Sequence, residues 1–266
     1  MKSVKETHLD KGIRKMLFGL PLAVFDALVA DQEVSALQEY ANTVSIMRLG
    51  YNDHGPVHMR KVTANALTIL RLLHDAGIQL TLEREELGGY EDSTVAVLLA
   101  AFLHDIGMSV GRAGHENHSA VLAVPIIDRV LGAVYPDDIM KRVILRSTAV
   151  EGIVGHMASS TIHSYEAGII LVADGCDMEK GRARIPLLLN RESRVGDIHK
   201  YSASSIEKVT IGKGEERPIR ITVEMTASVG FFQIEEVLFG KLSASPINQF
   251  IELHAGVMGR EMKRYQ

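Results

Sequence analysis

The amino-acid sequence predicts a mainly α-helical protein, a helical bundle that carries a small C-terminal α+β appendage of ββαβ order. Through most of the chain apolar residues stand three or four positions apart, as they do along residues 58–73, and this spacing is typical of amphipathic helices. Past residue 195 the pattern changes, because residues 219–225 alternate between apolar and polar as a half-buried strand does. We therefore expect a helical scaffold at 1–50, a helical domain at 51–194 and the appendage at 195–266.

Composition excludes several classes of protein. The 266 residues, 46% hydrophobic and 23% charged, suit a globular chain with one large domain and room for a small one. A net charge of −4 argues against duplex nucleic acid as a partner, since such binders usually carry a basic face. No apolar run approaches the roughly 18 residues of a membrane helix. The apolar stretch at 16–30 loosely resembles a signal peptide but contains Pro21 and Asp26. With Cys176 as the only cysteine, no intrachain disulfide can form, so we expect a reducing, cytoplasmic location.

The first helices flank a strongly punctuated turn at residues 52–56. Before the turn, apolar residues at helical spacing follow Asp31, a candidate N-cap. After the turn we expect a helix that begins at about Pro56 and ends at about Leu73, with His58 on its apolar face. His58 therefore points inward, either as a hydrogen-bonded core histidine or as a metal ligand. His54, in the turn, is expected to be structural or exposed.

The segment AFLHDIGM, residues 101–108, is the one around which the chain is organised. An apolar run from residue 95 leads into His104 and Asp105, and Gly107 stands where a helix C-terminus favours glycine. We predict a polar loop over 81–93 and then a buried helix over 95–106. A buried histidine and aspartate need a partner that offsets the cost of burying them, and a divalent metal ion is one such partner.

Further ligand candidates stand at the ends of later helices. His115 opens one helix, and either Asp137 or Asp138 is the expected N-cap of the next, which reaches His156. A helix over 161–173 leads directly into Asp174, whose carboxylate needs a partner if it is buried. A second His-Asp pair, at 74–75, also ends an apolar run, but no residue of ligand type follows it closely.

Two strands, a helix and a third strand are expected in the appendage. The strands are predicted at 206–211 and 219–225, with a turn at 212–214 and a helix over 231–238. Residues 251–257 alternate again and favour a strand, although Ser245 and Pro246 could instead start a helix.

The spacing of His58, the His104-Asp105 pair and Asp174 resembles the signature of the HD-domain superfamily, most of whose members are metal-dependent phosphohydrolases. The resemblance covers residues 53–184, about half of the chain. It implies a first metal site and, in dinuclear members, a second one that shares Asp105. The expected ligands are His58, His104, Asp105, His115, His156 and Asp174. Mixed imidazole and carboxylate ligands favour one or two divalent ions of Mn, Fe, Co, Ni, Zn or Mg over Ca.

One ligand assignment stays open within this set. His118 competes with His115, because residues three positions apart share a helix face. We prefer His115, which lies in a His-Glu-x-x-Ser-Ala motif, and place His118 among the candidate substrate-binding residues.

Residues that would act beside the metal follow from charge and position. Asp105 and Asp177 are candidate catalytic residues, with Asp177 either steering a ligand, acting as a general base or lying on the surface. Arg182 is a candidate for both catalysis and substrate binding, and Arg112 and Arg184 for substrate binding, since a guanidinium fork matches phosphate oxygens. The alternative for each arginine is a solvated surface charge.

These observations predict a metal-dependent phosphohydrolase that uses metal-activated water on a nucleotide or another small phosphorylated metabolite. We expect a homodimer. One alternative is a di-iron oxygenase of HD type, which would use the same ligands. Another is a regulatory or assembly module with a vestigial metal site, in which the appendage binds a ligand or pairs strands across a dimer.

Overall fold

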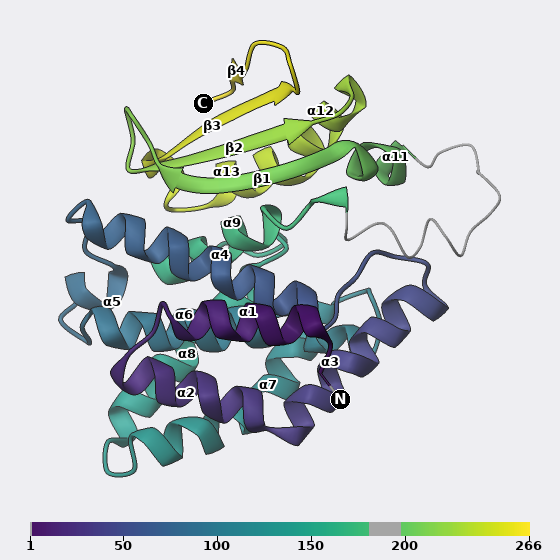
Figure 1. Cartoon of the computed structure of the whole chain (residues 1–266). Helices are drawn as coiled ribbons and strands as arrows, with labels where there is room; N and C mark the ends of the chain where they lie inside the picture. The colour runs from purple at the N-terminus through teal and green to yellow at the C-terminus, as the bar shows by residue number, and fades with distance from the viewer. Residues whose placement is uncertain (1, 181–197) are drawn as a thin grey trace.

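The computed structural model describes residues 2–180 and 198–266. A bundle of helices forms most of the molecule, and a small sheet covers one end of it (Figure 1). The structure confirms a mainly α-helical fold with a small α+β appendage. The helices of the bundle are α1 (Val4–Arg14), α2 (Gly19–Ala30), α3 (Gln32–Thr43), α4 (Pro56–Asp75), α5 (Thr81–Arg84), α6 (Tyr90–Leu103), α7 (His115–Val134), α8 (Ile139–Gly155) and α9 (Tyr165–Gly175).

Side-chain caps fix where several of these helices begin. The Asp31 carboxylate accepts the backbone N–H of Val34 at the start of α3, and Asp138 does the same at the start of α8, as predicted. Ser164 caps α9, so this helix begins at Tyr165, four residues later than the sequence pattern suggested, and it continues through Asp174. Asp174 is thus inside a buried helix.

The loop predicted over 81–93 is wrong in part. It contains the short helix α5, and α6 begins at Tyr90 rather than at residue 95. Acidic residues in the first turn of α6, Glu91 and Asp92, explain the difference: they are polar, yet they favour a helix N-terminus. The helix ends at Leu103, and a 3₁₀ turn (Ile106–Ser109) follows.

Gly107 serves a purpose other than the helix cap that the sequence suggested. Its φ angle is not positive, so no left-handed conformation demands glycine there. A Cβ atom at this position would instead lie 2.1 Å from the carbonyl oxygen of His115 and 2.4 Å from the backbone nitrogen of Ser119. The absent side chain lets α7 pack directly on the turn that follows the HD pair.

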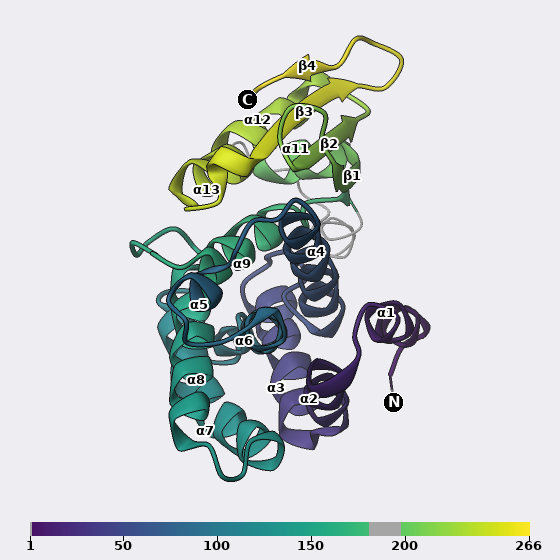
Figure 2. The ribbon, with the colours of Figure 1, turned by 90° about the vertical axis from the view of Figure 1, so that its left-hand side faces the viewer.

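The appendage contains the predicted ββαβ order, to which the structure adds a helix before the first strand and a short fourth strand after the third. Strand β2 pairs with β1 antiparallel and with β3 parallel, and the parallel pairing sets Ile221 opposite Leu253. The parallel connection runs through a helical stretch that lies against one face of the sheet (Figure 2). The described elements are α11 (Ile198–Ser205), β1 (Ile206–Lys213), β2 (Ile219–Met225), α12 (Phe231–Gln233), a π-helical stretch (Ile234–Phe239), α13 (Gly240–Ala244), β3 (Ile251–Val257) and β4 (Lys263–Arg264).

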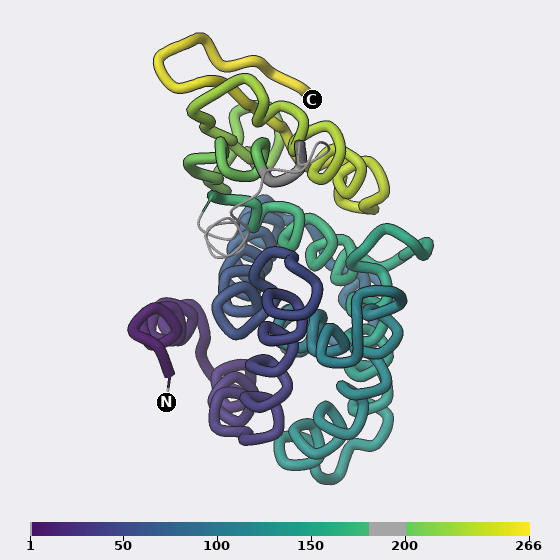
Figure 3. The backbone as a smooth tube through the Cα atoms, turned by 90° about the vertical axis from the view of Figure 1, so that its right-hand side faces the viewer, coloured from purple at the N-terminus to yellow at the C-terminus, as the bar shows by residue number. Residues whose placement is uncertain are grey.

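One hydrophobic core runs through both parts of the molecule. Buried side chains of the sheet, such as Ile221 and Leu253, belong to the same cluster as those of the bundle, such as Leu99 and Ile170. Helix α13 packs on α9, and the backbone trace shows this stretch between the sheet and the bundle (Figure 3). The boundary expected near residue 195 lies outside the described residues. Nowhere in the described part of the chain is a helix both long and apolar enough to cross a membrane.

Candidate metal centre

Six buried side chains from five helices meet at the end of the bundle that faces the appendage. His58 projects from α4, and His104 and Asp105 follow the last turn of α6. Helices α7, α8 and α9 supply the remaining three, which are His115, His156 and Asp174. These are the six residues that the resemblance singled out, and each is at least nine-tenths buried.

The two oxygens of Asp105 face two different groups of histidines. Oδ2 lies 3.1 Å from His58 Nε2 and 3.4 Å from His104 Nε2. Oδ1 lies 3.1 Å from His115 Nε2 and 3.4 Å from His156 Nε2. His58 and His104 thus belong to a first cluster, and His115 and His156 to a second. Asp105 lies between the two clusters and is shared by both, as a carboxylate that binds two ions would be.

Asp174 completes the first cluster. Its Oδ1 atom lies 3.2 Å from His58 Nε2 and 3.8 Å from His104 Nε2. Within each histidine pair the two Nε2 atoms are close: those of His58 and His104 are 3.2 Å apart, and those of His115 and His156 are 3.1 Å apart. His115, and not His118 one turn further along α7, is the histidine that meets Asp105 and His156.

Hydrogen bonds at the other ring nitrogen set the tautomer of every clustered histidine. Nδ1 of His104, of His115 and of His156 each donates to the backbone carbonyl three residues earlier, at 2.9, 3.0 and 2.6 Å. Nδ1 of His58 donates to the Asp177 carboxylate at 2.7 Å. Carbonyl oxygens only accept hydrogen bonds, and the Asp177 carboxylate, which also accepts from Lys61, does the same for His58. These Nδ1 atoms therefore carry the proton, and each Nε2 atom keeps its lone pair.

The two clusters could therefore each hold a metal ion. Lone pairs of Nε2 atoms and carboxylate oxygens converge within hydrogen-bond distance, and such a convergence is repulsive unless a proton or a cation lies between the atoms. His58, His104 and Asp174 form one group of suitable ligand atoms, and His104, Asp105 and His156 form another, so these two groups share His104. Nitrogen and oxygen donors of this kind suit a divalent transition ion.

The protonation states of these groups at neutral pH suit metal binding. Burial raises the pKa of Asp105, but the imidazoles around it, His104 foremost, outweigh burial and hold the pKa well below its usual value. The pKa of Asp174 is also well below its usual value, because Lys241 and His58 outweigh the opposing effect of burial. Burial lowers the pKa of His156 to about 4, so its imidazole is neutral. Metal ligands need these forms.

Comparison with known proteins identifies one clear relative. The chain is 39% identical over 241 residues to the "Uncharacterized protein MJ1020" of Methanocaldococcus jannaschii, and the match covers 91% of each chain. This chain belongs to the MJ1020 family. No family model matches it, and no solved structure does either.

In this member of the MJ1020 family, Asp177 contacts the centre through His58, on the side of the ring that faces away from the clustered Nε2 atoms. It is buried, so the surface position considered for it is wrong. While Oδ2 accepts from His58, Oδ1 accepts from Lys61 Nζ at 3.0 Å, and Lys61 also donates to Glu179 at 2.8 Å. Burial lowers the pKa of Lys61, but the two carboxylates outweigh it and raise the pKa above its usual value. Asp177 thus orients the His58 ring.

Lys241 is the main contribution of the appendage to the centre, and no sequence motif predicts it. Its Nζ atom donates to Asp174 Oδ2 and, at 2.8 Å, to the backbone carbonyl of His156. Lys241 lies 67 residues beyond Asp174 in the chain, on α13, just after the helix predicted over 231–238. Only the docking of the appendage brings it to the site.

A cavity of about 780 Å³ opens onto the centre. Its walls come from both parts of the molecule, because Asp105 and Asp174 lie at one side and Gln233, Glu236 and Lys241 come from the appendage. Such a cavity is large enough for a small organic ligand.

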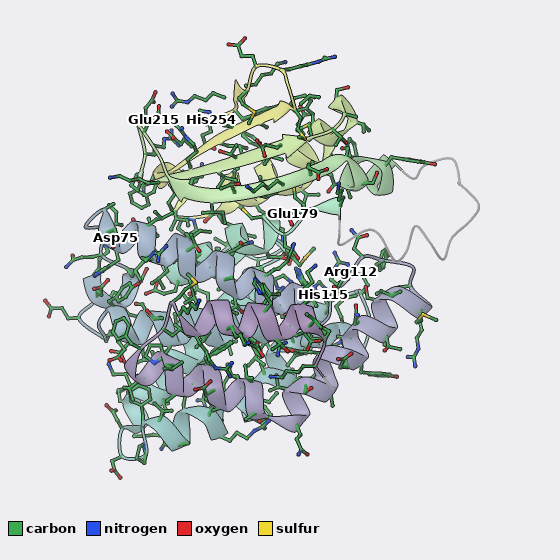
Figure 4. The ribbon with its side chains drawn as sticks, viewed as in Figure 1. Asp75, Arg112, His115, Glu179, Glu215 and His254 are labelled. Atoms are coloured by element: carbon green, nitrogen blue, oxygen red, sulfur yellow. The ribbon has the colours of Figure 1, made fainter. Side chains whose placement is uncertain are left out.

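The remaining predicted residues take different places. Arg112 lines the cavity and stands over the Tyr51 ring, with its Cζ atom 5.9 Å from the ring centroid. Figure 4 places Arg112 and His115 together at this end of the bundle, with Glu179 between bundle and sheet. The buried Nδ1 atom of His118 has no hydrogen-bond partner among the described residues. Arg182 and Arg184 lie outside the described residues.

Two further histidines near the sequence motif are accounted for structurally. His54 is buried, as the structural alternative expected, and its Nδ1 atom lies 2.7 Å from the Asn52 carbonyl and 2.9 Å from Ser45 Oγ. His74 is exposed and stacks on Tyr90 with 4.0 Å between ring centroids. Its neighbour Asp75 lies at the far end of the bundle from His115 (Figure 4).

Proposed function

We propose that this protein is a metal-dependent phosphohydrolase of the HD type that acts on a nucleotide or another small phosphorylated metabolite. The observation that carries the proposal is the pair of adjoining histidine clusters that share Asp105 and open onto a cavity with cationic side chains, Arg112 and Lys241. Two metal sites on one carboxylate suit phosphate-ester hydrolysis, in which a nucleophile and a phosphoryl oxygen must be held together.

The residues divide between two ions in this proposal. The first would be held by His58, His104, Asp105 and Asp174, and the second by Asp105, His115 and His156. Bound ions of this kind lower the pKa of water and neutralise charge that develops on a phosphoryl group.

The protein's own side chains set up the site before any ligand arrives. Backbone carbonyl groups at two helix ends and in the loop before α7, together with the Asp177 carboxylate, hold the imidazole rings, so little ordering is needed on binding. Arg112, at the cavity wall, is placed to bind an anionic group of a substrate by donating from its guanidinium.

Metal analysis of anaerobically purified protein, combined with turnover assays, tests this function. We expect two ions per chain and release of phosphate from members of a panel of phosphomonoesters, phosphodiesters and nucleotides. His104→Ala and Asp174→Ala should lose metal and turnover together. His74→Ala is the matched control, because His74 is exposed and precedes an aspartate as His104 does, and that aspartate, Asp75, lies far from His115 (Figure 4).

Other outcomes would overturn the proposal. Full metal content in both His104→Ala and Asp174→Ala would show that these residues do not bind metal, and the proposed metal centre would be wrong. Two irons per chain with oxygen uptake and no phosphate release would favour an oxygenase instead.

A further inference from the structure

The ammonium group of Lys241 lies at the metal centre, where a purely structural lysine would be unfavourable. Asp174 directs Oδ1 to His58 and His104 and Oδ2 to Lys241. With the first cluster loaded, two cations would share this single buried carboxylate and repel each other. An anion bound between them would relieve that repulsion, since it is attracted by both.

Packing holds the Lys241 side chain in this place. Its stem crosses helix α9 at Gly175, where a Cβ atom would lie only 3.2 Å from Lys241 Cδ. The neighbouring Leu238 side chain comes equally close to the same point. About two turns earlier in α9, Gly168 makes room for Ser245 and Pro246 in the same way. The glycines of α9 thus let the helical stretch of the appendage dock closely and aim Lys241 at the centre.

One hydrogen-bond donor of Lys241 remains for a ligand. An ammonium group has three N–H donors, and the Asp174 carboxylate and the His156 carbonyl accept two of them. In the part of the chain that the structure describes, Nζ has no other hydrogen-bond acceptor. Lys241 also lines the cavity that opens onto Asp105 and Asp174.

We propose that Lys241 is an anion-binding residue of the metal centre, whose third N–H donates to an oxygen of a bound phosphoryl group. This inference rests on the proposed function, because it assigns the ligand of the same site. It makes the appendage a part of the binding site and not a separate module.

Titration of inorganic phosphate into the metal-loaded full-length protein tests the assignment. We expect Lys241→Met to weaken phosphate binding about ten- to a hundredfold, the loss typical of a hydrogen bond to a charged group. Metal affinity should stay unchanged or rise, because the substitution removes a competing cation from Asp174. Lys241→Arg should recover part of the phosphate binding. A lysine with only a structural role would not separate the two affinities in this direction.

Lys141→Met is the matched control. Lys141 also forms a partly buried ion pair, with Asp92 at 2.8 Å, but it lies on α8 away from the cavity. This control should leave phosphate and metal binding unchanged. If Lys241→Met fails to fold, reductive methylation of the wild-type protein replaces it: phosphate should protect Lys241 from modification, as read by peptide mass spectrometry.

The outcomes separate this inference from the function on which it rests. Equal phosphate affinity in wild type and Lys241→Met, or no protection of Lys241, would overturn the assignment and leave the metal centre intact. If the wild type holds no metal, the proposed function fails, and phosphate titration of that protein still decides the role of Lys241. A loss of binding in Lys241→Met would then support it, and absent or unchanged binding would overturn it.

Discussion

At the scale of single residues, three of the four clustered histidines are each oriented by the backbone carbonyl three residues earlier in the chain. His104 and His156 follow the last turns of α6 and α8, and His115 opens α7. Carbonyl groups at the C-terminal end of a helix lack intrahelical partners, so Nδ1 of His104 and of His156 can each satisfy one locally. His115 Nδ1 instead donates to the Arg112 carbonyl in the loop before α7. His58, in the first turn of α4, depends instead on Asp177, which is 119 residues away in the chain.

Removal of the Asp177 carboxylate should therefore weaken metal binding while the fold persists. We expect Asp177→Ala to lower metal affinity about ten- to a hundredfold, the usual effect of losing the carboxylate that orients a histidine ligand. Isothermal titration with Mn²⁺ or Zn²⁺ would measure the change.

Glu179→Ala provides the comparison, since Glu179 shares Lys61 with Asp177 but does not touch His58. Equal metal affinities in the two variants would show that the contact between Asp177 and His58 has no part in binding.

The pKa of His156 predicts how the stability of metal-free protein depends on pH. Burial lowers this pKa from 6.5 to about 4, so the unfolded chain binds the proton more readily than the folded chain does. Stability from this group is fully present above pH 6.5 and is lost as pH falls toward 4. At pH 5 the loss amounts to about 2 kcal/mol, from 1.36 kcal/mol per pKa unit.

Urea unfolding of chelator-treated protein at pH 7 and pH 5 measures this loss. His156→Gln cannot take up the proton, so its stability should change less between the two pH values. An equal change in both proteins would assign the pH dependence to other groups.

At the scale of secondary-structure elements, close contact between the 3₁₀ turn and α7 connects the two metal clusters. The turn follows Asp105, and α7 carries His115, so their separation sets the distance between these two ligands. Gly107 makes the contact possible, and its N–H donates to Ser119 Oγ at 2.8 Å.

Gly107→Ala should separate these elements. The new methyl group would overlap backbone atoms of α7, which cannot move as a flexible side chain can. We expect a loss of about 2 kcal/mol or more in stability, at the upper part of the range for overpacked cores, together with loss of metal.

Gly111→Ala is the matched control for this substitution. A Cβ at Gly111, in the following loop, would have no neighbour within 4 Å, and its φ angle is not positive. Thermal unfolding and metal content should match those of the wild type. Metal retention by Gly107→Ala would show that α7 can shift without disturbing the clusters.

At the scale of the whole molecule, the shared core and Lys241 join the appendage to the bundle. Apolar side chains of both parts form one cluster, and the appendage supplies one wall of the cavity. We therefore expect both parts to unfold together, since neither buries its apolar surface alone.

Metal should then stabilise the entire molecule. An ion that binds only the folded state adds about 2.7 kcal/mol at a hundred times its Kd, which raises Tm by about 5–11 °C for a chain of this size. Differential scanning calorimetry should show a single transition that moves upward with added Mn²⁺, whereas His104→Ala should not respond. Two transitions, of which only one moved, would contradict the joint unfolding of bundle and appendage.

The sequence by itself determined the fold class and the local elements. Helical spacing, the caps at Asp31 and Asp138, and the alternation at residues 219–225 are local signals, and the structure follows each of them. Apolar runs that end at His104-Asp105 and at Asp174 also predict buried ligand groups, whereas the full set of six follows only from the resemblance to the HD-domain superfamily. The early start of α6 was missed, since acidic residues at a helix N-terminus read as a loop.

Only the tertiary structure decided which of these groups meet and what surrounds them. The choice of His115 over His118 at the cluster depends on the rotation of α7 about its axis, which periodicity leaves open for residues that share a face. Asp177 contacts His58, which is 119 residues away in the chain, and Lys241 contacts Asp174, which is 67 residues away. No local pattern encodes such contacts, because they form only when separate apolar surfaces pack into one core.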